Sequence, residues 1–227
     1  MSNHESSISI KSHVDALIES DGGLIGVLRF RMAEIELSST PNDSVGSLIQ
    51  SWLVDYTQSE KNLPTIIPNP KTQESPDYFI TNIDAGLHLE IKVFRKVNSP
   101  AFDIMQNFST VKDAISDDDL EKLHLDADYL IFEWDIVPEG IKVTRLFLQK
   151  VWEICGPSKK PWHDPITVHR DITTSVKSKK GVTQKIRPVR WFESDKGTKK
   201  AETFTNKEEM VEAIKKTKIT RDIKIKK

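Results

Sequence analysis

The chain has 227 residues, of which 37% are hydrophobic and 30% are charged, as is typical of a globular protein with a substantial core. No apolar run approaches the roughly 18 residues that a membrane-spanning helix needs, and the first residues lack the basic and apolar regions of a signal peptide. The single cysteine, Cys155, excludes an internal disulfide and a multi-cysteine zinc site. We therefore expect a cytoplasmic protein with no membrane partner.

Positive charge is concentrated in the C-terminal part. From Lys142 onward, 23 Lys and Arg residues stand against 10 Asp and Glu, whereas the residues before it carry 10 against 24. This asymmetry favours an anionic partner for the basic part, with nucleic acid as the first candidate. A basic segment that is merely solvated is the alternative.

The first third of the chain is predicted to be helical. Val14, Leu17 and Ile18 indicate a short helix that Gly22 and Gly23 end, and residues 24–37 are predicted to form a second one. A third helix should begin at Asp43 or Ser44, because one apolar stripe follows at helical spacing: Val45, Leu48, Ile49, Trp52, Leu53 and Tyr56. Residues 63–70 contain three prolines and are expected to form a loop or an edge segment.

A β-hairpin is predicted next. Residues 77–80 resemble a short strand, residues 82–86 a turn, and residues 87–94 a second strand with strict alternation. One face of that strand holds Leu87, Leu89, Ile91 and Val93, and the other holds His88, Glu90, Lys92 and Phe94.

The rest of the chain is predicted to mix both element types. We expect a helix over residues 102–115, a buried strand over 128–136, a second strand over 141–147 that returns beside it, and a hairpin tip at 177–181. Residues 151–154 fit either type. Asn206 is placed to cap a last helix over residues 208–218.

Three residues of the hairpin carry the chemistry. Glu90 and Lys92 lie two apart on a strand and so point to the same face, and Asp77, on the paired strand, can reach the same point. Two carboxylates supply the hard oxygen ligands that Mg²⁺ prefers. A lysine beside them can orient a metal-bound water and balance charge at a phosphate. The carbonyl of Ile91 is a further candidate metal ligand.

Pro76, Asp77, Glu90 and Lys92 resemble the motif of the PD-(D/E)xK nuclease superfamily, to which many type II restriction endonucleases belong. The resemblance implies an α/β fold with a mixed central sheet flanked by helices, and Mg²⁺-dependent cleavage of double-stranded DNA. It also implies that Asp77 and Glu90 bind the metal and that Lys92 lies beside the nucleophile.

The sequence departs from the superfamily pattern at one position. A helix upstream of the motif often carries an extra acidic ligand in this superfamily, and here the matching position holds Gln50. Either Gln50 binds a metal-bound water, or Glu34 or Glu36 supplies the missing charge.

Four further segments look like type II restriction enzymes of the NgoBV/NlaIV-like group, which recognises GGNNCC: residues 99–104, 126–132, 151–154 and 185–188. A palindromic site implies a homodimer, and a restriction system implies a cognate DNA methyltransferase. We expect a catalytic core over residues 1–156 and a basic DNA-binding part over 157–227, packed on the same domain. Its candidate DNA contacts are Lys179, Lys180, Lys185, Arg187 and Arg190.

Two other functions remain open. The first alternative to a restriction endonuclease is a repair or junction-resolving nuclease of the same superfamily. The second is a non-catalytic DNA-binding protein in which Asp77, Glu90 and Lys92 form an ordinary surface ion pair. Of the other notable side chains, Cys155 and Trp191 are expected in the core.

Overall fold

The computed structural model describes residues 3–20, 22–27, 29–32, 35–38, 42–70, 77–80, 87–98, 100, 102, 104–108, 125–159, 166–172, 182–195 and 197–216. The chain divides into two compact units. The first comprises residues 1–100 and 126–150, and the second comprises residues 101–125 and 151–227.

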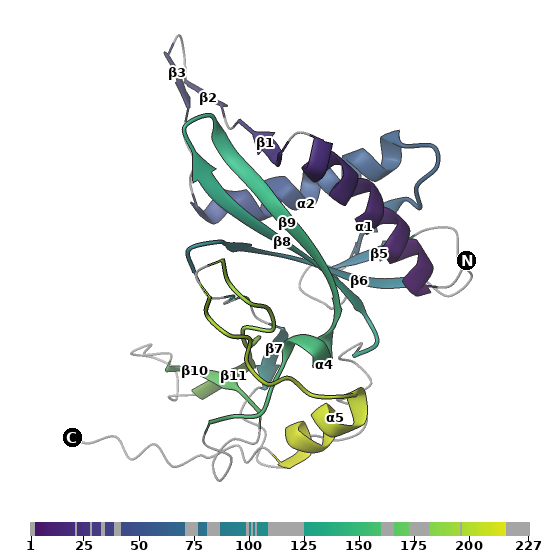
Figure 1. Ribbon diagram of the computed structural model, residues 1–227, viewed down its shortest axis with the longest axis vertical. Coiled ribbons are helices and arrows are strands. Elements are labelled where there is room, and N and C mark those ends of the chain that lie inside the picture. Colours follow the sequence, from purple (N-terminus) through teal and green to yellow (C-terminus); the bar gives the residue numbers. More distant parts are fainter. Residues whose placement is uncertain are drawn as a thin grey trace, which may run out of the picture. The chain divides into compact units, whose positions relative to one another are not determined.

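The first unit is built on a six-stranded mixed sheet (Figure 1). Its strands are, in spatial order, β1 (Leu24–Gly26), β9 (Gly140–Lys150), β8 (Asp128–Val137), β6 (Leu87–Arg95), β5 (Tyr78–Ile80) and β4 (Ile66–Pro68). The central pair, β6 and β8, is parallel, and the other pairs are antiparallel. The predicted strands of the hairpin pair as expected, and the strands predicted over residues 128–136 and 141–147 are present. The turn predicted over residues 82–86 lies outside the described residues.

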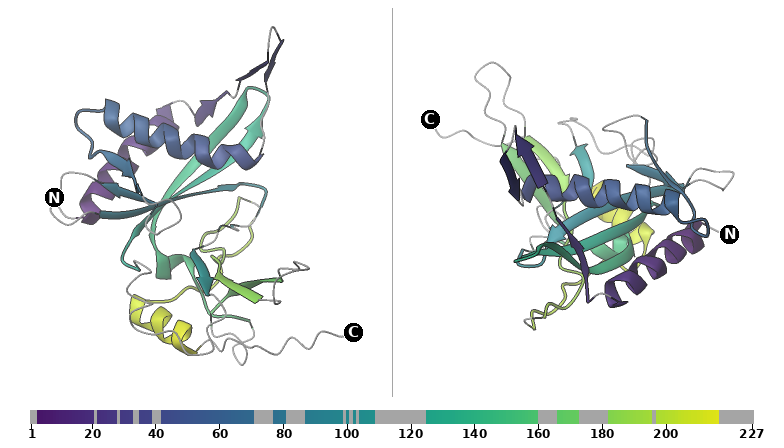
Figure 2. Two further views of the ribbon diagram at one scale, coloured as in Figure 1. Left: turned by 180° about the vertical axis from the view of Figure 1, so that it is seen from behind. Right: turned by 90° about the horizontal axis from the view of Figure 1, so that it is seen from above.

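Two helices cover this sheet (Figures 1 and 2). Helix α1 (Asn3–Ser20) lies against β8 and β9, and α2 (Asn42–Ser59) lies against β4 and β6. The apolar stripe predicted for α2 enters the core, where Val45, Ile49 and Leu53 pack with strand residues such as Ile91 and Phe132. Helix α1 is longer than the short helix predicted and adds Ile10 and Val14 to the same core. The predicted α/β class with a mixed sheet flanked by helices is confirmed.

The helix predicted over residues 24–37 is wrong. The segment forms β1 and then an antiparallel pair, β2 (Arg29–Met32) and β3 (Ile35–Ser38). Phe30 lies opposite Leu37, and Met32 lies opposite Ile35. Apolar and polar residues thus alternate along both strands with the period of two that a strand requires. The apolar spacing that predicted a helix here arises by chance from the two-residue alternation of these strands.

The second unit contains a three-stranded antiparallel sheet in the order β10 (Val168–Ile172), β11 (Val182–Ile186) and β7 (Met105–Phe108). The helix predicted over residues 102–115 is therefore wrong at 105–108, where pairing with β11 overrides the local helical pattern. Residues 109–124 lie outside the described residues, as does the predicted hairpin tip at 177–181. The strands on either side of that tip do pair, with Ile172 opposite Val182.

Two short helices complete the second unit. Residues 151–154, ambiguous in sequence, form α4 (Val151–Ile154), and α5 spans Lys207–Lys216. Asn206 caps α5 as predicted, because its Oδ1 accepts a hydrogen bond from the backbone N–H of Glu209 at 2.9 Å. Cys155 and Trp191 are buried, as expected, and burial raises the pKa of the Cys155 thiol. None of the helices described is both long and apolar enough to cross a bilayer.

Candidate active site

The register of the β5–β6 hairpin brings Asp77 next to Glu90. Tyr78 is paired with Leu89, so the residue before Tyr78 lies beside the residue after Leu89. The backbone N–H of Asp77 lies 3.3 Å from Oε1 of Glu90 and donates a hydrogen bond to it. On the other side, the Asp77 carbonyl accepts a hydrogen bond from the N–H of Asn69 at 3.0 Å. Asp77 is thus held from both neighbouring strands.

Lys92 joins the two carboxylates. Its Nζ donates a hydrogen bond to Oδ2 of Asp77 at 2.5 Å and lies 2.7 Å from Oε2 of Glu90. The side chains of Glu90, Lys92 and Asp77 are 4%, 17% and 39% exposed. The cluster therefore has its most accessible carboxylate at Asp77, whereas Leu89 and Ile91 are fully buried in the core on the opposite face of β6.

The electrostatics of the cluster are those of two acids that share one cation. Burial raises the pKa of Glu90 to about 7, against the opposing effect of the Lys92 ammonium, and the negative charge of Asp77 adds to the rise. Burial lowers the pKa of Lys92, but the carboxylates of Glu90 and Asp77 outweigh it, and the net shift is upward. Lys92 therefore stays charged at neutral pH, and Glu90 titrates near it.

The donor set suits a hard divalent cation. Two carboxylates and the main-chain carbonyl of Ile91 offer oxygen atoms, the kind of ligand that Mg²⁺ prefers. The positively charged Lys92 ammonium lies between the two carboxylates. No group of three or more His, Cys, Asp or Glu residues that could hold a metal occurs in the part of the chain that the structure describes. The cluster therefore offers two carboxylates, those of Asp77 and Glu90, as candidate metal ligands.

Of the three residues considered for the extra ligand, Gln50 reaches the site. Its Nε2 donates a hydrogen bond to the carbonyl oxygen of Ile91 at 2.8 Å. Glu34 lies outside the described residues, and Glu36 lies in β3, where the backbone alone is described. The sequence identified Gln50 at this position of the helix but did not indicate that its partner is a main-chain carbonyl.

The candidate DNA contacts belong to the second unit. Lys179 and Lys180 lie outside the described residues, and Lys185 pairs with His169 in the β10–β11 ladder. Arg187 and Arg190 follow β11 and are half-buried. The Arg190 guanidinium carbon lies 5.4 Å from the ring centroid of Phe192, a cation–π arrangement that fixes the direction of a planar donor group.

One ion pair on the same sheet escaped the sequence analysis. Glu133 of β8 is 1% exposed, and both of its carboxylate oxygens accept hydrogen bonds at 2.9 Å from Nε and Nη2 of Arg145. Thr144 donates a third, also at 2.9 Å. A charged residue inside the apolar run of residues 129–134 was the available signal, because a buried carboxylate requires a partner.

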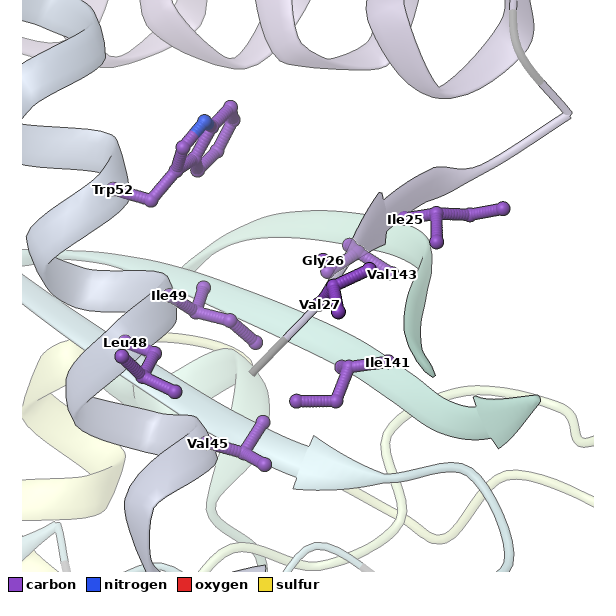
Figure 3. Close-up of a pocket in the computed structure, with 9 residues that line it drawn as sticks. All are labelled: Ile25, Gly26, Val27, Val45, Leu48, Ile49, Trp52, Ile141 and Val143. Carbon is purple, nitrogen blue, oxygen red and sulfur yellow. The ribbon is translucent and has the colours of Figure 1, made fainter. Parts of the chain in front are cut away.

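A cavity of about 220 Å³ in the first unit lies apart from this chemistry (Figure 3). Its lining is made up of glycine and apolar side chains from α2, β1 and β9 and the residue after β1: Ile25, Gly26, Val27, Val45, Leu48, Ile49, Trp52, Ile141 and Val143. It offers no metal ligand and no general base, so the hairpin cluster is the candidate active site.

Comparisons with known proteins show the family of the chain. The family model described as the NgoBV restriction endonuclease matches residues 8–226. The type II restriction enzyme NlaIV of Neisseria lactamica is 33% identical over 195 residues, which cover 85% of this chain and 72% of that enzyme. The type II restriction enzyme NgoBV of Neisseria gonorrhoeae is 28% identical over 148 residues, which cover 60% of this chain and 81% of that enzyme.

A solved structure supports the same relationship. The NlaIV restriction endonuclease matches the fold with a TM-score of 0.63 and 28% identity, over 89% of this chain and 76% of that chain. The resemblance to type II restriction enzymes of the NgoBV/NlaIV-like group is thereby confirmed. The chain belongs to the NgoBV restriction endonuclease family, whose relatives here are type II restriction enzymes and therefore site-specific deoxyribonucleases.

Proposed function

We propose that this protein cleaves both strands of a specific double-stranded DNA sequence by Mg²⁺-dependent hydrolysis at Asp77, Glu90 and Lys92. Membership of a restriction endonuclease family supports the reaction class. The observation that carries the assignment to these residues is the meeting of the Lys92 ammonium with the carboxylates of Asp77 and Glu90, within 2.7 Å of both.

Each residue has a distinct role in this proposal. Asp77 and Glu90, with the carbonyl of Ile91, would hold the metal. When bound, the metal supplies a Lewis acid and lowers the pKa of a water molecule. Lys92 gives up its contact with at least one carboxylate and donates hydrogen bonds to the attacking water or to a phosphate oxygen. Glu90, with a pKa near neutrality, must be deprotonated to serve as a ligand.

We further propose that the basic part, residues 157–227, binds the DNA and that residues 1–156 cleave it. Lysine and arginine contact phosphates, and arginine reads guanine through a bidentate pair in the major groove. Arg187 and Arg190 are the preferred contacts, with Lys179, Lys180 and Lys185 beside them in sequence. The proposed site is GGNNCC. Its palindromic form favours a symmetric dimer, because the two-fold symmetry of the protein then mirrors that of the site. The protein would act in the cytoplasm, and a cognate DNA methyltransferase would act on the same site.

The test is incubation of the purified protein with phage DNA and Mg²⁺. We expect a discrete set of bands whose ends map to GGNNCC, and no cleavage by Asp77→Ala or in EDTA. Preferential cutting of branched DNA over linear duplex would instead identify a junction-resolving nuclease. Binding of duplex without cleavage at any Mg²⁺ or Mn²⁺ concentration would leave a DNA-binding protein and overturn the proposal.

A further inference from the structure

Gln50 connects helix α2 to the candidate active site. Its neighbours Ile49 and Leu53 are buried in the core, which fixes the helix against the sheet. From this position the half-buried Gln50 side chain places its Nε2 atom 2.8 Å from the carbonyl oxygen of Ile91. The contact joins the helix to the residue that lies between Glu90 and Lys92 on β6.

The contact lies just beyond the point on β6 where the pairing with β5 ends. Over the strands as described, β5 pairs with β6 at Leu87–Leu89 and no further, so Ile91 lies beyond the end of that pairing. Ile91 is fully buried, and a buried main-chain carbonyl requires a hydrogen-bond donor. Gln50 supplies one from a side chain of α2.

The chemistry of the amide matches this partner. Of the two polar atoms in a glutamine side chain, only Nε2 can donate a hydrogen bond to a carbonyl oxygen, because Oε1 is an acceptor. A glutamate at position 50 would place two acceptor oxygens face to face in the metal-free protein. A glutamine therefore suits a role directed at the Ile91 carbonyl, and it adds no third negative charge to Asp77 and Glu90.

We propose that Gln50 is a positioning residue of the metal site, holding the Ile91 carbonyl in the orientation in which it binds the cation. This inference rests on the proposed function, because Ile91 is a ligand only if the cluster binds a metal. A carbonyl oxygen has two lone pairs, so it accepts the Gln50 hydrogen bond with one and keeps the other for the cation. Such outer hydrogen bonds orient metal ligands, and their loss typically weakens metal binding 10- to 100-fold.

The test measures Mn²⁺ affinity without DNA, from the electron paramagnetic resonance signal of the free ion. Gln50→Leu removes the donor at similar size, and Gln58→Leu makes the same change at an exposed position of the same helix. We expect the dissociation constant to rise about 10-fold or more in Gln50→Leu and to stay within about twofold of the wild type in Gln58→Leu. Equal affinity in Gln50→Leu and wild type would overturn the inference alone. A wild type that shows no Mn²⁺ binding sensitive to Asp77→Ala would overturn the proposed function as well.

A second measurement on the wild type covers the case in which Gln50→Leu does not fold. The side-chain amide protons of Gln50 should resonate downfield of those of the exposed Gln58, because the former are hydrogen-bonded. Saturating Mg²⁺ should shift the Ile91 carbonyl carbon and leave the Gln50 amide protons downfield. If Mg²⁺ moves them to the position of Gln58, the side chain has left the carbonyl and the inference is wrong.

Discussion

The Nζ atom of Lys92 lies 2.7 Å from Oε2 of Glu90, which stands two residues before it on the same strand. The pair is nearly buried, and Lys92 also contacts Asp77. One ammonium therefore neutralises part of the charge on two carboxylates. A divalent cation would compete with that ammonium for the same carboxylate oxygens. The metal-free protein thus holds the candidate ligands and Lys92 together.

We predict that the cleavage rate decreases as the pH is lowered below about 7. Burial raises the pKa of Glu90 to about 7, so below that pH Glu90 takes up a proton and no longer binds metal well. Activity at limiting Mg²⁺ should fall roughly tenfold per pH unit well below the pKa. A pH profile of initial cleavage rates measures this, with the circular dichroism of the folded protein over the same pH range as the control. A profile that stays flat down to pH 5 would contradict it.

Stability without metal should change with pH in the opposite sense. The folded-state pKa of Glu90 is raised above its unfolded value, so its contribution is fully present below about pH 4 and is lost as the pH rises through about 7. Relative to Glu90→Gln, the wild type should lose on the order of 3 kcal/mol of unfolding free energy across that range. Urea unfolding in EDTA at pH 4.5 and pH 8 measures this difference. A constant difference between the two proteins would show that Glu90 is not buried as described.

We predict that Lys92→Met separates metal binding from cleavage. The change removes the ammonium that competes for the carboxylates, so Mn²⁺ should still bind, whereas cleavage should fall by about 10²- to 10⁴-fold because the group beside the attacking water is lost. Asp77→Asn should lose both. Lys96→Met, at an exposed position just after β6, is the matched control and should keep both. Cleavage by Lys92→Met within about threefold of the wild type would remove Lys92 from the active site.

The hairpin that holds the candidate active site was predictable because its signal is local. The alternation of Leu89, Glu90, Ile91 and Lys92 fixes which side chains share a face, and Asp77 lies close enough in sequence for one hairpin to bring it there. The contact of Gln50 with Ile91 was not predictable, because it depends on how α2 lies on the sheet. The error at residues 24–37 has a related cause, since partners across the β2–β3 pair decide between a helical and a strand pattern there.

The ion pair between the buried Glu133 and Arg145, whose side chain is 34% exposed, should be important for stability. Arg145→Met leaves the 1% exposed carboxylate of Glu133 without its two guanidinium hydrogen bonds, and breaking a buried pair on one side typically costs about 3–5 kcal/mol. The pair of Arg95 and Asp135 is 29% and 28% exposed, so Arg95→Met should cost roughly 1 kcal/mol or less. Chemical unfolding of both variants measures the contrast. Equal losses in the two variants would contradict the burial assigned to Glu133.

The stacking of Arg190 on Phe192 leads to a prediction about DNA binding. Arg190→Ala should weaken duplex binding. The thermal unfolding temperature should stay close to that of the wild type, because the guanidinium is only half-buried and lies over one face of a ring.

A second variant, Arg190→Lys, separates two kinds of contact with DNA. If Arg190 contacts a phosphate, lysine should restore most of the affinity, and alanine should lower the salt dependence of binding by about one unit. If it reads a guanine, lysine should restore little, because the bidentate fork is lost and the discrimination against a changed base pair drops by roughly 1–3 kcal/mol. Filter binding at several salt concentrations, with cognate and single-substituted duplexes, distinguishes the two. Unchanged affinity in Arg190→Ala would remove this residue from the DNA interface, and the basic segment would need another contact to explain its charge.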